Sequence, residues 1–326
     1  MKAFTGGIAA ALLGLTCVGA QAEPVSFVTI GHSYYSAALF VAEREGIFKK
    51  YGLEPQVTVV GGGPLALQAV LSGNADVGVL SYEHVLTAAA NGRKMVAVFN
   101  MVSRPTSNII ASNPMVSAAK GKSLADKIKD LKGKRIGVPA QGGSGDKLAR
   151  ALLAEQGIKA SDVDMVYSGA STGSYVAALQ RNLIDAAIVP EPAGLQTTEK
   201  GVGGVYLDLL GGEVPAFKDM IYMSLTTTPQ MIAKKPELVR KVVAAFAEAH
   251  KVIKENPERA ISDMKAEYPD MTDAMNRELF KMLNEGWSRD GNMSLAQAKA
   301  TFAYLQPEGD HPINFPETFT NEFLPK

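Results

Sequence analysis

Six short loops hold the side chains best suited to binding a ligand. They are His32–Tyr35, Gly61–Gly63, Ser81–Glu83, Gln141–Gly145, Ser168–Thr172 and the single position Glu191. Their glycine, hydroxyl and tyrosine groups supply hydrogen bonds and flat apolar surfaces, and nothing among them resembles an acid–base pair or a metal cluster. With one cysteine and four histidines in 326 residues, we expect no metal and no cofactor. The pattern therefore favours binding over catalysis.

The loop Gln141–Gly145 is the best candidate for contact with an anion. Its glycines let bare N–H groups face a ligand, Ser144 adds a hydroxyl, and a following helix adds partial positive charge. A plain tight turn could have the same composition. The loop is not of the nucleotide-binding type, because no Gly-Lys-Ser/Thr follows it.

Glu191 and a tyrosine pair could contact other parts of a ligand. Pro190 and Pro192 restrict the backbone around Glu191, so its carboxylate is aimed in advance and could accept a hydrogen bond from an amine or a ring N–H. A solvated surface position is the alternative. Tyr34 and Tyr35 could form an aromatic wall, with one of the two facing the core.

A second pattern would indicate a different chemistry. Gly169–Gly173 matches G-x-S-x-G between a strand and a helix, and His250 or His311 follows in the order of a hydrolase triad. Ser171 and Thr172 are also ordinary helix N-caps. Since a hydrolase sheet is one continuous layer and this chain predicts two units, we rank the hydrolase well behind binding.

The loops follow strands in two units of the same order. The first unit has strands Val25–Ile30, Pro55–Val60 and Asp76–Leu80, with helices from about Ser36 and over Leu65–Ser72. The second has strands Arg135–Pro139, Val163–Tyr167 and Asp185–Val189, with helices Asp146–Gln156 and Ser174–Asn182. A β-α-β-α-β order predicts a parallel sheet, with ligands beyond the carboxyl ends of its strands. Short matches, Ala69-Val70 with Ala178-Leu179 among them, support a repeated architecture.

Two crossings predict two lobes with a cleft between them. Strands at Val96–Val102, Asn108–Ala111 and Met220–Thr226 would let the chain leave the first lobe, build the second and return, before a helical stretch over Pro236–Leu305. We predict residues 23–104 and 225–326 as lobe 1, and residues 105–224 as lobe 2.

The first 22 residues are typical of a cleaved secretory signal. Lys2 precedes an apolar run over Ile8–Val18 that is too short to span a bilayer, and Ala20-Gln21-Ala22 is a cleavage site. Cys17 matches a lipid-attachment signal poorly. We expect cleavage after Ala22, a periplasmic location and a monomer. The remaining chain has one more acid than base, which argues against nucleic acid or an anionic membrane as partner, and we expect no direct membrane insertion.

Three segments resemble a known family. They are Ser36–Glu54, Gly61–Gly63 with Leu71–Gly78, and Leu131–Val138. They are similar to motifs of bacterial solute-binding proteins from ABC importers, in the nitrate/sulfonate/taurine and thiamine-precursor group. The resemblance implies a periplasmic binding protein fold of type II, with two β-α-β lobes joined by two hinge strands. It also implies cleft closure around a small-molecule solute, followed by docking to a membrane permease.

The resemblance also places the ligand loops. They fall on Ser33, Tyr34, Tyr35, Gly62, Ser81, Tyr82, Gly143, Ser144 and Glu191. In the sulfonate and taurine relatives, the position of Gly143 and Ser144 lies near the anionic head, and an acid at Glu191 can meet an amine. We therefore expect an aliphatic sulfonate or taurine as the solute. A pyrimidine-type thiamine precursor and an aromatic carboxylate are the alternatives.

Two other classes of function stay open. Pyrimidine synthases resemble this family, but they carry a cysteine-rich motif and work inside the cell, whereas this chain has a single cysteine within an export signal. An exported sensor-linked or solute-sequestering protein without a permease is the other. Permease and ATPase genes beside this one would favour the importer.

Overall fold

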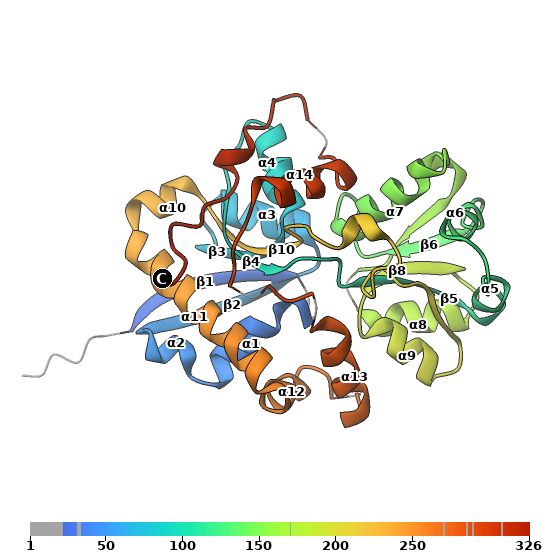
Figure 1. Cartoon of the computed structure of the whole chain (residues 1–326), viewed down its shortest axis with the longest axis horizontal. Coiled ribbons are helices and arrows are strands. Elements are labelled where there is room, and N and C mark those ends of the chain that lie inside the picture. Colours follow the sequence, from blue (N-terminus) through green and yellow to red (C-terminus); the bar gives the residue numbers. More distant parts are fainter. Residues whose placement is uncertain are drawn as a thin grey trace, which may run out of the picture.

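The computed structural model describes residues 22–30, 34–169, 171–269, 271–284, 286–288, 290–307 and 309–326. Residues 1–21 of the predicted signal, with Cys17, lie outside the described residues, and so do His32 and Ser33 of the first loop. The described chain forms two α/β lobes side by side, each built on a five-stranded sheet (Figure 1). The predicted fold of two sheet-based lobes is confirmed.

The first sheet contains the first predicted unit. Its strands are β1 (Glu23–Ile30), β2 (Leu53–Val60), β3 (Val77–Ser81), β4 (Val96–Val102) and β10 (Met223–Thr227), in the order β2-β1-β3-β10-β4. Its helices include α1 (Ala37–Arg44), α2 (Ile47–Lys50), α3 (Gly63–Leu71) and α4 (Glu83–Ala90). β1 pairs in parallel with β2 and β3, as the β-α-β-α-β order predicts.

The second sheet repeats this arrangement. Its strands are β5 (Ser107–Ser112), β6 (Arg135–Val138), β7 (Asp164–Tyr167), β8 (Ala186–Pro190) and β9 (Gly203–Leu207), in the order β7-β6-β8-β5-β9. Its helices include α5 (Asn113–Ala118), α6 (Leu124–Lys129), α7 (Ser144–Glu155), α8 (Thr172–Gln180) and α9 (Ala193–Glu199). β6 pairs in parallel with β7 and β8.

One strand in each sheet lies outside the two predicted β-α-β-α-β units and runs antiparallel to its neighbours. β10 runs antiparallel to β3 and β4, and β5 runs antiparallel to β8 and β9. Each of these strands enters its sheet from the other lobe, at the edge where the parallel strands end. Met223 of β10 pairs with Ser81 at the end of β3, and Ser107 of β5 pairs with Pro190 at the end of β8. A strand that starts at this edge must run the opposite way.

An aspartate holds the same place in both lobes. Asp76 precedes β3 and accepts a hydrogen bond of 2.9 Å from the backbone N–H of Ser26 in β1, 50 residues earlier. Asp185 precedes β8 and accepts one of 2.9 Å from the backbone N–H of Arg135 in β6, also 50 residues earlier. The offset in residue number between Asp76 and Asp185 equals the offset between Ser26 and Arg135. The same offset relates Ala69-Val70 to Ala178-Leu179. This supports the predicted repeat.

The two connections between the lobes lie against each other. The Met220 N–H donates to the Ser103 carbonyl at 2.8 Å, and the Tyr222 N–H donates to the Val102 carbonyl at 3.0 Å. They therefore form a short two-stranded ribbon. Hinge closure of a two-lobed protein is concentrated in such element-terminal residues. The lobe boundaries at residues 104 and 224 stay predictions.

Further helices cover the first lobe. They are α10 (Pro229–Lys234), α11 (Pro236–Glu255), α12 (Pro257–Lys265), α13 (Asp273–Leu283) and α14 (Leu295–Tyr304) (Figure 1). α11 buries the predicted stripe of Val239, Val242, Val243 and Phe246. The Phe246 ring packs 5.9 Å from the rings of both Phe27 and Phe48, which ties α11 to β1 and α2. No helix among the described residues is long and apolar enough to cross a membrane.

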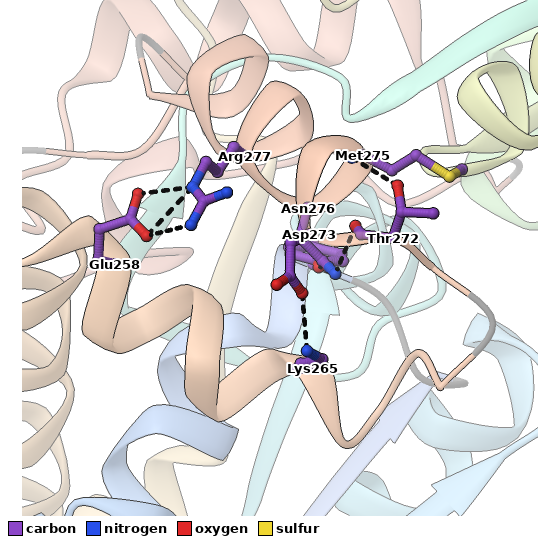
Figure 2. Close-up of polar contacts among 8 residues, drawn as sticks. Glu258, Lys265, Thr272, Asp273, Met275, Asn276 and Arg277 are labelled. Atoms are coloured by element: carbon purple, nitrogen blue, oxygen red, sulfur yellow. Dashed lines mark hydrogen bonds and ion pairs between the residues drawn. The ribbon is translucent and has the colours of Figure 1, made fainter.

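Polar contacts fix α13 next to the first loop. Glu258 pairs with Arg277 at 3.0 Å, and Lys265 pairs with Asp273 at 2.7 Å. Figure 2 shows both ion pairs beside α13. The Thr272 side chain caps α13, and the Asn276 side-chain amide donates to the Thr272 carbonyl at 3.1 Å. The other end of the Asn276 amide accepts a hydrogen bond from the Tyr34 hydroxyl. This hydrogen bond anchors Tyr34, just before α1, to a residue of α13 that lies 242 positions further along the chain.

Candidate functional site

A cavity of about 80 Å³ lies between the two lobes. The first lobe contributes Ile30, Tyr35, Gly62, Gly63, His84 and Met223. The two connections and the second lobe contribute Thr106, Ser107, Pro139, Ala140, Gly143, Ser144, Gly145, Thr172, Ile188, Pro190, Glu191 and Tyr222. Most follow the carboxyl end of a parallel strand, where open α/β sheets bind ligands. The lobes meet over the cavity, since a Cβ on Gly62 would lie 3.0 Å from that of Ala140.

Glu191 follows β8 and lines this cavity, and its carboxylate is buried. It is 2% exposed, and it accepts hydrogen bonds from the Asn108 amide at 2.8 Å, the Gly194 N–H at 3.0 Å and the Leu195 N–H at 3.3 Å. Gly194 is required here because a Cβ would lie 2.3 Å from the carboxylate. Burial raises the pKa of Glu191, and these three donors only partly counter it. A solute N–H or ammonium group would stabilise the ionised form.

Ser144 begins α7 and faces the cavity with Gly143 and Gly145. Its hydroxyl donates to a carboxylate oxygen of Glu83 at 2.7 Å, and Glu83 is fully buried. Burial alone would raise the pKa of Glu83, but His84, Lys147 and the hydroxyls of Ser81 and Ser144 lower it overall. An ionised carboxylate only accepts, so Ser144 keeps its lone pairs, and not its proton, for a solute. The amides at the start of α7 stay the groups suited to an anion.

His84 is the one imidazole that lines the cavity among the described residues. It is 1% exposed, and its Nε2 lies 3.3 Å from Glu83 without a hydrogen bond within the described chain. Burial lowers the pKa of His84, and the neighbouring Glu83 carboxylate acts in the opposite direction. Gly63 allows the close approach of this ring, because a Cβ there would lie 1.8 Å from Nε2. An unpartnered buried nitrogen is available to a bound solute.

The cavity walls are mainly apolar, with little positive charge. None of the described lining residues is a lysine or an arginine. The buried carboxylates of Glu191 and Glu83 lie at or just behind the wall, and Lys147 lies behind it with its ammonium 2.8 Å from the Thr87 hydroxyl. The wall has aromatic sides in Tyr35 and Tyr222. This composition suits a small, flat or compact solute that donates hydrogen bonds.

Three predicted binding residues lie in the core and not at the cavity. Tyr34 is 1% exposed, and its ring stacks on Tyr268 with centroids 4.7 Å apart. Ser81 is fully buried at the end of β3, and Tyr82 is fully buried with its hydroxyl bonded to Thr318 of the C-terminal segment. None of these three is among the residues that line the cavity. Of the tyrosine pair, Tyr35 is the one that lines the cavity, and Ser33 lies outside the described residues.

The cavity also contains residues that the sequence did not single out. His84, Thr106, Ser107 and Tyr222 are the polar examples. His84 directly follows the predicted loop Ser81–Glu83, so extending that loop by one residue would have found it. Tyr222 lies on the return connection, where no local motif marks it.

The hydrolase alternative has no geometric support. Ser171 is exposed at the start of α8, while His250 is 2% exposed inside the first lobe against the ring of Phe99. His311 is exposed beside Gly92 in the first lobe. No group of three or more metal-ligating side chains occurs among the described residues.

Two five-stranded mixed sheets in one strand order, joined by paired connections around a cavity, define a periplasmic binding protein fold of type II. Solved structures agree. A protein from Bordetella bronchiseptica RB50 is 27% identical, covers 92% of this chain and 95% of its own, and has a TM-score of 0.78. The alkanesulfonate-binding protein SsuA from Xanthomonas axonopodis pv. citri, bound to MOPS, is 18% identical with a TM-score of 0.70, covering 92% of this chain and 100% of its own.

The chain belongs to the NMT1/THI5-like family, whose model matches residues 33–260. A protein of Brucella abortus (strain 2308) with a provisional binding-protein name is 29% identical over 297 residues, which are 87% of each chain. A 4-amino-5-hydroxymethyl-2-methylpyrimidine phosphate synthase of Aspergillus parasiticus is 25% identical over 315 residues, 93% of this chain and 87% of the synthase. The relatives of this chain therefore include one named as a binding protein and one named as a synthase.

Proposed function

We propose that this chain is the solute-binding subunit of an ABC importer. It captures a small solute in the cavity between its lobes, closes over it and delivers it to a membrane permease. The observation that carries this is the cavity itself, lined by strand ends of both lobes and bridged by a two-stranded connection. A solute that contacts both lobes stabilises the closed state. The signal pattern supports export with cleavage after Ala22 to the periplasm, where the chain acts as a monomer.

For the solute we propose a molecule that donates a hydrogen bond to Glu191. Taurine, one of the predicted solutes, satisfies this: its ammonium would face Glu191 and its sulfonate the amides that begin α7. A plain aliphatic sulfonate is less well supported. It would lack a partner for the buried Glu191 carboxylate, meet no lysine or arginine among the described lining residues, and find the Ser144 proton already donated to Glu83.

A pyrimidine-type thiamine precursor is supported by a different observation. Tyr35, Tyr222 and Ile188 offer flat apolar surfaces to a ring, and an exocyclic amine or ring N–H could donate to Glu191. The name of the Aspergillus parasiticus relative points to the same chemistry. An aromatic carboxylate fits less well, since it brings a negative charge and no donor.

Calorimetric titration with four probes tests these proposals. Taurine, ethanesulfonate, 4-amino-5-hydroxymethyl-2-methylpyrimidine and benzoate differ in charge and in donors. We expect binding by taurine or the pyrimidine, and weaker or no binding by ethanesulfonate and benzoate. Failure of all four would refute the solute class. Tight binding of ethanesulfonate alone would refute the role of a donor.

The variant Glu191→Gln tests the contact directly. We expect it to weaken a donor-bearing solute at least tenfold, about 1.4 kcal/mol, and to leave ethanesulfonate unchanged or improved. Glu317→Gln is the matched control, because Glu317 is an exposed carboxylate paired with Lys94 away from the cavity. An equal loss for amine-bearing and plain sulfonates would rule out charge pairing by Glu191.

The relatives named as pyrimidine phosphate synthases support an enzymatic alternative. The chain has one cysteine, Cys17, which falls within the predicted signal. Incubation of the purified protein with candidate precursors, followed by mass spectrometry for a pyrimidine phosphate, separates the two. Formation of that product would replace the importer proposal.

A further inference from the structure

We propose that Glu83 is a positioning residue for solute capture, which holds Ser144 of the opposite lobe and thereby stabilises the closed cleft. This rests on the proposed capture function, but the contact itself needs no solute. Glu83 does not line the cavity. It acts through Ser144, which does, and lies next to His84, which also does.

Two hydrogen bonds join the lobes at this place. The Ser144 hydroxyl donates to Glu83 at 2.7 Å, and the Lys147 ammonium donates to the Thr87 hydroxyl at 2.8 Å. Glu83 and Thr87 lie one turn apart on α4, and Ser144 and Lys147 lie one turn apart on α7. The two helices therefore meet along a full turn. We call these four residues the lobe clasp.

The clasp can exist only in the closed arrangement. Its donors belong to the second lobe and its acceptors to the first, so any hinge opening separates both pairs. Glu83 then exchanges for water a buried environment in which Oε1 accepts from Ser144 and Oε2 has no hydrogen-bond partner among the described residues. A carboxylate with a short hydroxyl donor makes one of the stronger hydrogen bonds in proteins, whereas one buried without donors is costly. The lobe clasp is therefore formed when the cleft is closed and broken when the cleft is open.

The sign of the effect follows from the environment of Glu83. Burial opposes its ionisation, yet His84, Lys147, Ser81 and Ser144 lower its pKa overall. The closed surroundings therefore favour the charged form more than water does. Of these groups, Lys147 and Ser144 come from the second lobe, so part of the preference disappears on opening. Ionised Glu83 therefore stabilises the closed cleft relative to the open one.

Closure without solute can be measured with spin labels. Leu65 in the first lobe and Leu183 in the second are exposed at 61% and 58%, and the one native cysteine, Cys17, lies in the predicted signal, so a chain that begins at Glu23 has no other labelling site. Labels on Leu65→Cys and Leu183→Cys report the lobe separation as a distance distribution by double electron–electron resonance. We expect the wild type to populate a closed distance and the variants Glu83→Gln and Ser144→Ala to shift toward a second, open distance.

The expected shift is about tenfold in the closed-to-open ratio, the factor that 1.4 kcal/mol represents. Because the two residues act through one contact, the double variant should differ little from either single variant. Glu317→Gln, a carboxylate change confined to the first lobe, should leave the distribution unchanged. Melting curves of all variants separate a change of closure from loss of folding.

Three results would overturn the inference. They are an unchanged distribution in both single variants, a wild type with no closed population, and a Glu83→Gln variant that closes further. The last would mean that the cost of burying the charge outweighs its hydrogen bond. None of these depends on the titration panel, so failure of the solute class and failure of the lobe clasp are distinguishable.

Discussion

Lowering the pH should destabilise the first lobe through one buried histidine. His250 on α11 is 2% exposed, packs its ring 5.1 Å from that of Phe99, and places Nδ1 at 3.4 Å from the Ser288 carbonyl. Burial lowers its pKa to about 4, with a further small contribution from Lys254, while the Ser288 carbonyl acts in the opposite direction. The folded chain therefore resists protonation, whereas the unfolded chain accepts a proton near pH 6.5.

The magnitude follows from linkage. A histidine whose folded pKa is depressed gives full stability above pH 6.5, and this stability falls as the pH drops through 6.5 toward 4. The difference between 6.5 and about 4 corresponds to about 3 kcal/mol below pH 4. At pH 5 most of it, about 2 kcal/mol, should already be lost.

Urea unfolding at pH 8 and pH 5 measures this loss. Trp287 is the single tryptophan, and it adjoins Ser288, so its fluorescence follows the segment that His250 contacts. His250→Asn keeps an amide near the Nδ1 position and cannot be protonated. We expect it to lower stability at both pH values through lost packing, but to remove about 2 kcal/mol of the pH dependence.

The comparison uses the change between the two pH values, so the packing cost of the substitution cancels. His311→Asn, a change at an exposed histidine, should retain the pH dependence of the wild type. If wild type and His250→Asn lose equal stability between pH 8 and pH 5, the buried neutral histidine is not what makes the lobe sensitive to acid.

Two other substitutions have defined outcomes. Burial, together with the nearby Glu45, raises the pKa of Asp263 to about 6, so its ionisation costs stability as the pH rises from about 4 through 6; Asp263→Asn should therefore raise the melting temperature at pH 8 and not at pH 4, and a gain at both would contradict this. The second substitution, Gly63→Ala, would place a Cβ 1.8 Å from His84 Nε2, so we expect it to weaken solute binding at least tenfold by titration. The control Gly61→Ala has open space at its Cβ and should not weaken binding. Equal affinities of the two variants would show that His84 can move freely.

The sequence predicted the strands better than their directions. Short runs rich in apolar residues identify β1, β2, β3, β6, β7 and β8, and glycine loops follow β1, β2, β6 and β7, because pattern and turn chemistry are local. The direction of β5 and β10 depends on which lobe the chain has just left, which no local pattern contains. β9 begins with Gly203-Gly204, which weakens its strand signal, and it escaped prediction.

The same limit applies to the candidate site. Glu191, Gly143, Ser144 and Gly62 line the cavity because each follows a strand, which a sequence can reveal. Their binding role remains a proposal. The Tyr82 side chain points into the core, where its hydroxyl is hydrogen-bonded to Thr318, 236 residues further along the chain. The local sequence around Tyr82 contains no sign of so distant a partner. Tyr34 is likewise held in the core, where its hydroxyl donates a hydrogen bond to the distant Asn276.

The matched aspartates imply that the solute meets two unequal copies of one surface. The step that carries Asp76 onto Asp185 also carries Ile30 onto Pro139, Tyr35 onto Ser144 and Gly63 onto Thr172, and all six of these residues line the cavity. Where one half offers an aromatic ring or a bare backbone, the other offers a hydroxyl. An enclosure with similar backbone but different side-chain chemistry on its two sides favours one orientation of an asymmetrical molecule over the reverse orientation.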